Sequence, residues 1–323
     1  MIYSKSWQGR FVSGRATAPV LLGVSLLMWL VGIFFDVPVG ELSIFGQKIG
    51  NVVSRCITFT CFAFSAVMMS SWYVLDRRIH WFLSLFFYLA SVSLCVHGCV
   101  KYSVSLLFVQ LVMHRLFACK QDEDCRYGLF SAFVVSGLAT MFFPQFIMLL
   151  PLFVLYILMT KLAGKREIFS IMLGLLTPYW FLFGVDYIFP EMLEQSGLFA
   201  SSIIYVASVV PTKLSLLNVS LAFLELLVLI PYVVIFSCSA VPGKPLLRKR
   251  LQFFAWMNLY LTALMFLYSQ DFLLYYIWSL PSLAVMLAYV FSLNVTRFSR
   301  FYFIVVNVIL LAIVPFCLWL NRL

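Results

Sequence analysis

Long runs of apolar residues recur from residue 17 to the C-terminus, and each run is broken only by a few charged residues. A helix that crosses a bilayer needs roughly 20 apolar residues, and several of these runs reach that length. Only 11% of the residues are charged and 64% are hydrophobic, whereas about 25% are charged in ordinary soluble domains. Because so few polar side chains cannot cover a water-facing surface, we predict an all-α, polytopic transmembrane helix bundle.

The pattern predicts eleven helices joined by short loops. The first covers about 17–35 and is too long for a signal-peptide core, so we expect it to be retained as a helix. The others are expected near 52–75, 81–100, 103–119, 128–143, 146–162, 169–186, 214–240, 252–269, 271–292 and 301–320. Residues 1–16 form a basic N-terminal segment, and 17–323 form a single transmembrane domain.

Two regions allow a second interpretation. The run 128–162 predicts two helices hinged at Phe143-Pro144-Gln145, because a residue before proline disfavours the helical conformation. One long kinked helix is the alternative, and it would reverse the side of every later loop. The stretch 187–213 holds an apolar segment that is too short to span comfortably, so we expect an outer loop with an interfacial or re-entrant part.

Basic residues predict the orientation of the chain. If the N-terminus is cytoplasmic, 17 of the 22 Lys and Arg residues fall on the cytoplasmic side. The outer side then keeps Lys48, Arg55, Lys101, Lys213 and Arg322. Cytoplasmic loops carry an excess of Lys and Arg, so this pattern favours a cytoplasmic N-terminus. The +10 net charge is dispersed among loops, so it does not indicate nucleic-acid binding.

Polar residues within two apolar runs are candidates for an intramembrane site. In LFVQLVMHRLFACK, Arg115 lies near the cytoplasmic end, where its long side chain can reach water, although a functional role is the alternative. Gln110 is deeper, and we expect it to bond a neighbouring helix. Glu225 lies close to mid-membrane, and Asn218 lies two turns earlier on the same face. Glu225 is expected to be protonated or paired, either as a structural group or on a proton or substrate pathway.

Acidic residues gather on the predicted outer side. Asp36 and Glu41 lie in the first outer loop, and Glu191 and Glu194 lie one helical turn apart in the segment 187–213. Arg55 and Lys213 are expected at the outer ends of their helices. Acids beside a basic residue would suit a sugar or the phosphate of a lipid headgroup, although acids also populate outer loops without any function.

Other signatures give no support for metal or cofactor chemistry. In CVHGC, Cys95 and Cys99 would share a helical face but His97 would point nearly opposite, which disfavours a metal site. The sequence contains no Gly-rich phosphate loop, GxSxG or HExxH motif. We therefore expect no cofactor and no metal.

The segment from LLFVQLVMHRLFACK to LAGKREIFSIMLGLLTPYWFLFG resembles an uncharacterised family of multi-pass bacterial inner-membrane proteins. The positions that match are Arg115, the FFPQF bend and Lys165-Arg166, over about 80 residues. The family has no assigned activity, so the resemblance implies only the bacterial inner membrane as the setting.

The arrangement of many helices, short loops and outer acids is also similar to membrane glycosyltransferases that use polyprenyl-phosphate sugars. In those enzymes a carboxylate of the first outer loop commonly serves as the base, a role that the resemblance implies for Asp36 or Glu41. The present first outer loop has only about sixteen residues, whereas those enzymes usually carry longer helical insertions there.

Three functions are therefore open. The first is handling of a lipid-linked, polyprenyl-phosphate glycan at the outer face, with Asp36 or Glu41 as general base and Arg55 holding the phosphate; Glu191, Glu194 and Lys213 would complete that site. The second is a transporter or flippase that uses Glu225, with Asn218 lining the path. The third is a non-catalytic scaffold that binds other membrane proteins of an envelope assembly. Membrane lipid is an expected partner in each.

Overall fold

The computed structural model describes residues 17–34, 47–72, 82–119, 125–162, 164–188, 215–238, 245–293 and 297–320. In these ranges the regular structure is entirely helical, with eleven α-helices, which confirms the all-α class and the predicted number of helices. The chain divides into two compact units. Unit 1 comprises Met1–Val104 and Pro211–Leu323, and unit 2 comprises Ser105–Val210.

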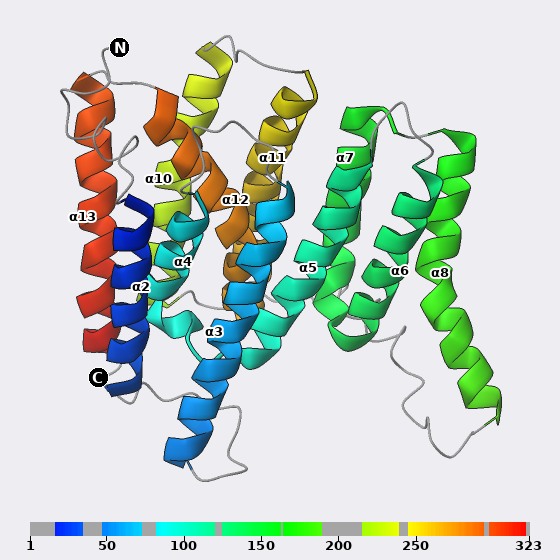
Figure 1. Ribbon diagram of the computed structural model, residues 1–323, viewed down its shortest axis with the longest axis horizontal. Coiled ribbons are helices and arrows are strands. Elements are labelled where there is room, and N and C mark those ends of the chain that lie inside the picture. The colour runs from blue at the N-terminus through cyan, green and yellow to red at the C-terminus, as the bar shows by residue number, and fades with distance from the viewer. Residues whose placement is uncertain are drawn as a thin grey trace. The chain divides into compact units, whose positions relative to one another are not determined.

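Unit 1 is a bundle in which successive helices run in alternating directions (Figure 1). Its helices are α2 (Thr17–Phe34), α3 (Gln47–Trp72), α4 (Phe82–Val92), α10 (Leu216–Cys238), α11 (Pro245–Leu267), α12 (Phe272–Leu293) and α13 (Arg297–Leu320). The first residues of α3 and the first residues of α11 therefore lie at opposite ends of this unit (Figure 1).

Helix α12 forms the centre of unit 1. It contacts α4, α10 and α11, and 94% of its apolar stretch is buried, against 44% of that of α3. Tyr275, Trp278 and Leu283 are fully buried along its length. Its sequence is apolar around most of the helix, with a few hydroxyl-bearing residues such as Ser279 that bond to neighbouring helices.

Hydroxyl groups of tyrosines link neighbouring helices of unit 1. Tyr232 of α10 donates a hydrogen bond to the carbonyl oxygen of Leu251 in α11, at 2.9 Å. Tyr302 of α13 donates to the carbonyl oxygen of Leu227 in α10, at 3.1 Å. Leu227 is four residues before Pro231, which lies inside α10 and has no N–H to offer that carbonyl. Tyr302 therefore satisfies the backbone group that the proline leaves free, as neighbouring helices do in membrane proteins.

Unit 2 contains α5 (Val100–Ala118) from Ser105 onward, α6 (Arg126–Phe142), α7 (Leu150–Thr160) and α8 (Lys165–Ile188). A 3₁₀ segment, η3 (Pro144–Leu149), connects α6 to α7. Phe143 has extended backbone angles, φ −131° and ψ 91°, so the helix breaks directly before the proline. α6 and α7 run in opposite directions (Figure 1), and the prediction of two hinged helices in 128–162 is confirmed.

Small residues allow α6 and α8 to pack closely. A Cβ atom at Gly137 would lie 2.8 Å from the carbonyl oxygen of Leu175, and one at Gly174 would lie 2.5 Å from that of Phe130. The hydroxyl groups of Thr140 and Tyr179 share a 2.6 Å hydrogen bond across the same interface. Close backbone approach at small residues, with a polar bond across it, is typical of helix pairs in membranes.

The predicted helix 81–100 is wrong at its C-terminal end. α4 ends at Val92, a 3₁₀ turn η2 follows (Leu94–Val96), and Gly98 has a φ of 95°. A residue with a side chain rarely adopts this φ, so the glycine permits the reversal into α5. Other helices begin earlier than predicted. Their first turns contain charged residues such as Lys165 and Arg248, so the sequence pattern assigned these turns to loops.

Within the described part of the chain, three helices are long and apolar enough to cross a membrane: Gly50–Met69, Lys165–Val185 and Ser269–Ser292. Six shorter apolar helices accompany them. In unit 2, the basic residues Arg115, Arg126, Lys161, Lys165 and Arg166 occupy helix ends that meet at one end of the unit (Figure 1). This distribution is the one that the predicted orientation requires, and the membrane topology itself stays a prediction.

Replacement of Tyr302 by Phe should lower the free energy of unfolding by about 1–3 kcal/mol, because the Leu227 carbonyl loses its donor. In a Pro231→Ala background the cost should fall to a few tenths of that value, since the alanine N–H restores the helical bond. Unfolding of the four proteins of this double-mutant cycle in one detergent measures the difference. Equal costs in the two backgrounds would contradict the assignment.

Candidate functional site

Several residues predicted for an outer site lie outside the described part of the chain. These are Asp36, Glu41, Glu191, Glu194 and Lys213. The predictions that involve them stay predictions. The other predicted residues fall on described helices, and unit 1 contains two separate groups of buried polar side chains.

The first group, here named the arginine cluster, consists of Trp29, Arg55 and His97. Arg55 is only 2% exposed. It lies on α3, which begins at Gln47 and not near residue 52 as predicted. At 1.5 Å per residue its Cα is therefore roughly 12 Å from the start of the helix, and roughly 7.5 Å from Gly50, where the apolar stretch of α3 begins. A buried arginine within an apolar helix is costly and marks a candidate functional site.

Trp29 and His97 form the wall beside this arginine. Their rings stack with centroids 3.7 Å apart and an interplanar angle of 7°. Phe59, one turn after Arg55 on α3, packs edge-on against Trp29 with centroids 5.5 Å apart. His97 lies within electrostatic range of Arg55. Residues from α2, α3 and the η2 turn thus converge on one buried position in unit 1.

The arginine cluster is rich in hydrogen-bond donors. The indole Nε1 of Trp29 is buried and makes no hydrogen bond to the described residues. The carbonyl groups of Ala90 and Ser91 face the His97 ring, but neither ring nitrogen reaches them with hydrogen-bond geometry. Guanidinium and indole groups can donate hydrogen bonds but cannot accept them. The cluster is therefore suited to a group that brings acceptor oxygens and negative charge.

The second group, here named the glutamate cluster, consists of Glu225, Asn258, Thr262 and Ser279. Glu225 has no exposed surface and lies near the middle of α10. Thr262 of α11 donates a 2.7 Å hydrogen bond to its Oε2 atom. Ser279 of α12 donates to its Oε1 atom. The carboxyl group thus joins three helices at the centre of unit 1.

A count of the hydrogen atoms indicates which form of Glu225 fits this site. The Thr262 hydroxyl also lies 2.8 Å from the carbonyl oxygen of Asn258, and the Ser279 hydroxyl 2.7 Å from that of Tyr276. Each hydroxyl has one hydrogen, and each stands between two acceptors. A neutral carboxyl group completes the network, because its O–H donates to one hydroxyl and its other oxygen accepts from the second. A carboxylate would leave a buried charge held by two neutral hydroxyls alone.

Asn258 was not identified from the sequence. It lies one turn before Thr262 on α11, is fully buried, and neither its Oδ1 nor its Nδ2 atom bonds a described residue. A lone Asn in an apolar run was the available signal, and its spacing of four from Thr262 places both on one helical face. The hydrogen bond from Thr262 to Glu225 on another helix could not be predicted from spacing.

The remaining intramembrane candidates lie elsewhere. Asn218 is half-buried in the first turn of α10 and its N–H donates to the Ser215 hydroxyl. In unit 2, Gln110 is 1% exposed, and its Oε1 atom accepts no hydrogen bond from the described residues. Arg115 is exposed in the last turn of α5, as expected for a side chain that reaches water at a helix end.

Within the described ranges, no group of three or more His, Cys, Asp or Glu side chains could hold a metal ion. Comparisons with models of known protein families, with curated proteins and with solved structures found no match. The chemistry of the two clusters is therefore argued from their own residues.

Replacement of Glu225 by Gln should change the free energy of unfolding by no more than about 1 kcal/mol, because an amide offers one donor and one acceptor side in the same shape. Glu225→Ala should cost about 2–4 kcal/mol through the cavity and the lost bonds. Unfolding of the three proteins in one detergent tests this. A Gln variant as unstable as the Ala variant would indicate that a carboxylate, not a neutral carboxyl group, occupies the site.

Proposed function

We propose that the protein is a multi-pass protein of the bacterial inner membrane that handles a polyprenyl-phosphate-linked glycan at its outer face. The observation that carries this proposal is the burial of Arg55 beside two further donor groups, Trp29 and His97, in unit 1. Helices long and apolar enough to cross a membrane support the setting. The basic helix ends of unit 2 support a cytoplasmic N-terminus.

Arg55 is the proposed ligand of the phosphate. Its planar guanidinium group can donate two parallel hydrogen bonds to a phosphate, and charge-assisted bonds of this kind are about twice as strong as neutral ones. Burial increases the strength of the attraction, because the dielectric constant around the pair is low. The Trp29 indole N–H would donate a further bond to a phosphate or sugar oxygen, and its ring offers an apolar surface.

Asp36 or Glu41 is the proposed general base if the handling is a glycosyl transfer. Asp36 follows the last residue of α2, Phe34, by two positions, and Trp29 lies five residues before the end of this helix. In the transfer, the acceptor hydroxyl oxygen bonds to the anomeric carbon while the bond from that carbon to the phosphate oxygen breaks. The carboxylate takes the hydroxyl proton, and the polyprenyl phosphate leaves. Glu191, Glu194 and Lys213 are proposed to contact the sugar or the phosphate.

Arg55→Ala should reduce the polyprenyl-phosphate lipid that co-purifies with the detergent-extracted protein by at least about 10-fold, the effect of losing roughly 1.4 kcal/mol. Arg55→Lys should retain part of the bound lipid, because lysine keeps the positive charge but cannot donate two parallel hydrogen bonds to the phosphate. Lipid mass spectrometry on equal amounts of folded protein measures both.

Lys101→Ala is the matched control, because Lys101 is an exposed cation of the predicted outer side and lies at the start of α5. This variant should bind as the wild type does. Detection of bulk phospholipid alone in the wild type would remove the proposal, as would an equal loss in the Lys101 and Arg55 variants.

A second candidate function, a transporter or flippase, is favoured by the glutamate cluster. A neutral Glu225 at the centre of unit 1 has a proton to give, and the buried Asn258 amide beside Thr262 has polar atoms to offer a substrate. Ionisable residues at this depth mark proton relays and substrate pathways in many membrane proteins. In this function Asn218 would line the path from the outer end of α10.

If Glu225 couples protons to movement of a substrate, Glu225→Gln should leave the protein folded but abolish its cellular function at every pH, because the amide cannot take up and release a proton. Complementation of a deletion strain across a range of external pH measures this. Thr262→Val is the control, since it removes one hydroxyl of the same cluster without removing the carboxyl group. A Gln variant that complements at every pH would leave Glu225 a structural role only.

A further inference from the structure

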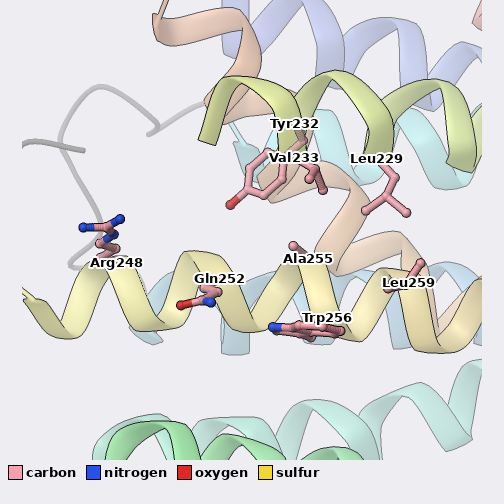
Figure 2. A pocket seen from close by; sticks show the side chains of 8 residues that line it. All are labelled: Leu229, Tyr232, Val233, Arg248, Gln252, Ala255, Trp256 and Leu259. Carbon is pink, nitrogen blue, oxygen red and sulfur yellow. The ribbon is translucent and has the colours of Figure 1, made fainter. Parts of the chain in front are cut away.

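A cavity of about 410 Å³ lies between α10 and α11 of unit 1. Leu229, Tyr232 and Val233 line it from α10, and Arg248, Gln252, Ala255, Trp256 and Leu259 line it from α11 (Figure 2). Its volume is within the range of roughly 300–1,000 Å³ that is typical of small-molecule sites. These eight residues are here named the α10–α11 groove. None of them belongs to the arginine cluster or the glutamate cluster.

The groove is open to the surroundings along its apolar side. Val233 is 45% exposed, Trp256 46% and Leu259 47%. On a helix bundle that spans a membrane, such a surface faces hydrocarbon chains. Tyr232 does not place a free hydroxyl in this wall, because its hydroxyl group donates to the Leu251 carbonyl. The apolar wall therefore fits an acyl chain.

One end of the groove is polar and positively charged. Arg248 and Gln252 lie at that end, and Leu229 and Leu259 lie toward the other (Figure 2). Arg248 is exposed in the first turn of α11, where Lys249 and Arg250 follow it. None of the eight lining residues is acidic. The polar end therefore complements a negatively charged headgroup.

The length of the groove corresponds to one leaflet of a bilayer. Leu259 follows Arg248 by eleven positions on a continuous helix, which at 1.5 Å per residue spans roughly 16 Å. Half of the hydrocarbon core of a bilayer is about 15 Å thick. A headgroup at Arg248 would thus place its acyl chain along the groove as far as the middle of the membrane.

We propose that the α10–α11 groove is a binding site for an anionic phospholipid, whose phosphate contacts Arg248 and Gln252 and whose acyl chain lies between α10 and α11. By the predicted orientation this lipid belongs to the cytoplasmic leaflet. The site is independent of the proposed glycan function, because the start of α11 lies at the opposite end of unit 1 from the start of α3, the helix that carries Arg55 (Figure 1).

Titration of the purified full-length protein with phosphatidylglycerol and with phosphatidylcholine, followed by native mass spectrometry, tests the site. The wild type should bind phosphatidylglycerol more tightly. Arg248→Ala should weaken that affinity by about 5-fold, the effect of one basic residue near a membrane surface, and should weaken phosphatidylcholine less, because its choline group already offsets the charge of the phosphate. Arg248→Gln, which is closer in length, should behave in the same way.

Lys249→Ala is the matched control, because it removes the same charge one residue away and Lys249 does not line the groove. It should change the affinity by less than about 2-fold. Ala255→Phe fills the groove and should weaken both lipids. Equal effects of the Arg248 and Lys249 variants would show non-specific attraction and overturn the proposal. Unchanged binding in Ala255→Phe would overturn it too, as would occupation of the groove by a second copy of the chain in the same spectra.

Discussion

The need to satisfy polar groups away from water is the constraint on which the rest of unit 1 depends. Helix α12 is enclosed by α4, α10 and α11, so each polar group that it presents must find its partner within the bundle. Ser279 meets Glu225 of α10, and Tyr276 shares a 2.8 Å hydrogen bond with Ser93 beyond the end of α4. These bonds are directional, whereas apolar contacts between helices in lipid are not. They therefore contribute to the register in which α12 packs.

Proline and tyrosine show the same constraint acting on the backbone. Pro231 frees the Leu227 carbonyl within α10, and Tyr302 of α13 supplies a donor to it. The Leu227 carbonyl can therefore be satisfied by a neighbouring helix only where that helix carries a hydrogen-bond donor at the same level along α10. A feature that weakens one helix in isolation becomes a specific contact between two helices once they are packed.

Much of the architecture follows from the sequence, because length, hydropathy and proline position are local properties. They predict the eleven helices and the break before Pro144. They fail at the end of α4, where Gly98 turns the chain within an apolar run, and at Arg55, because the first turns of α3 are polar enough to resemble a loop. The position of Glu225 near the middle of its helix is also local and could be predicted. Its partners Thr262 and Ser279 could not be predicted, because a single sequence does not show which helices pack against one another.

The glutamate cluster and the arginine cluster differ in the balance of their hydrogen-bond donors and acceptors. At Glu225 the donors and acceptors of the carboxyl group and its two hydroxyl partners balance once the carboxyl group is neutral, whereas the Asn258 side chain of the same cluster bonds no described residue. In the arginine cluster the buried indole N–H of Trp29 bonds no described residue, and the guanidinium of Arg55 can only donate. Burial of a positive group is tolerated where a negative one binds with it. A phosphate at the arginine cluster would offset the cost of burying this positive charge, which is the reason for placing the proposed site there.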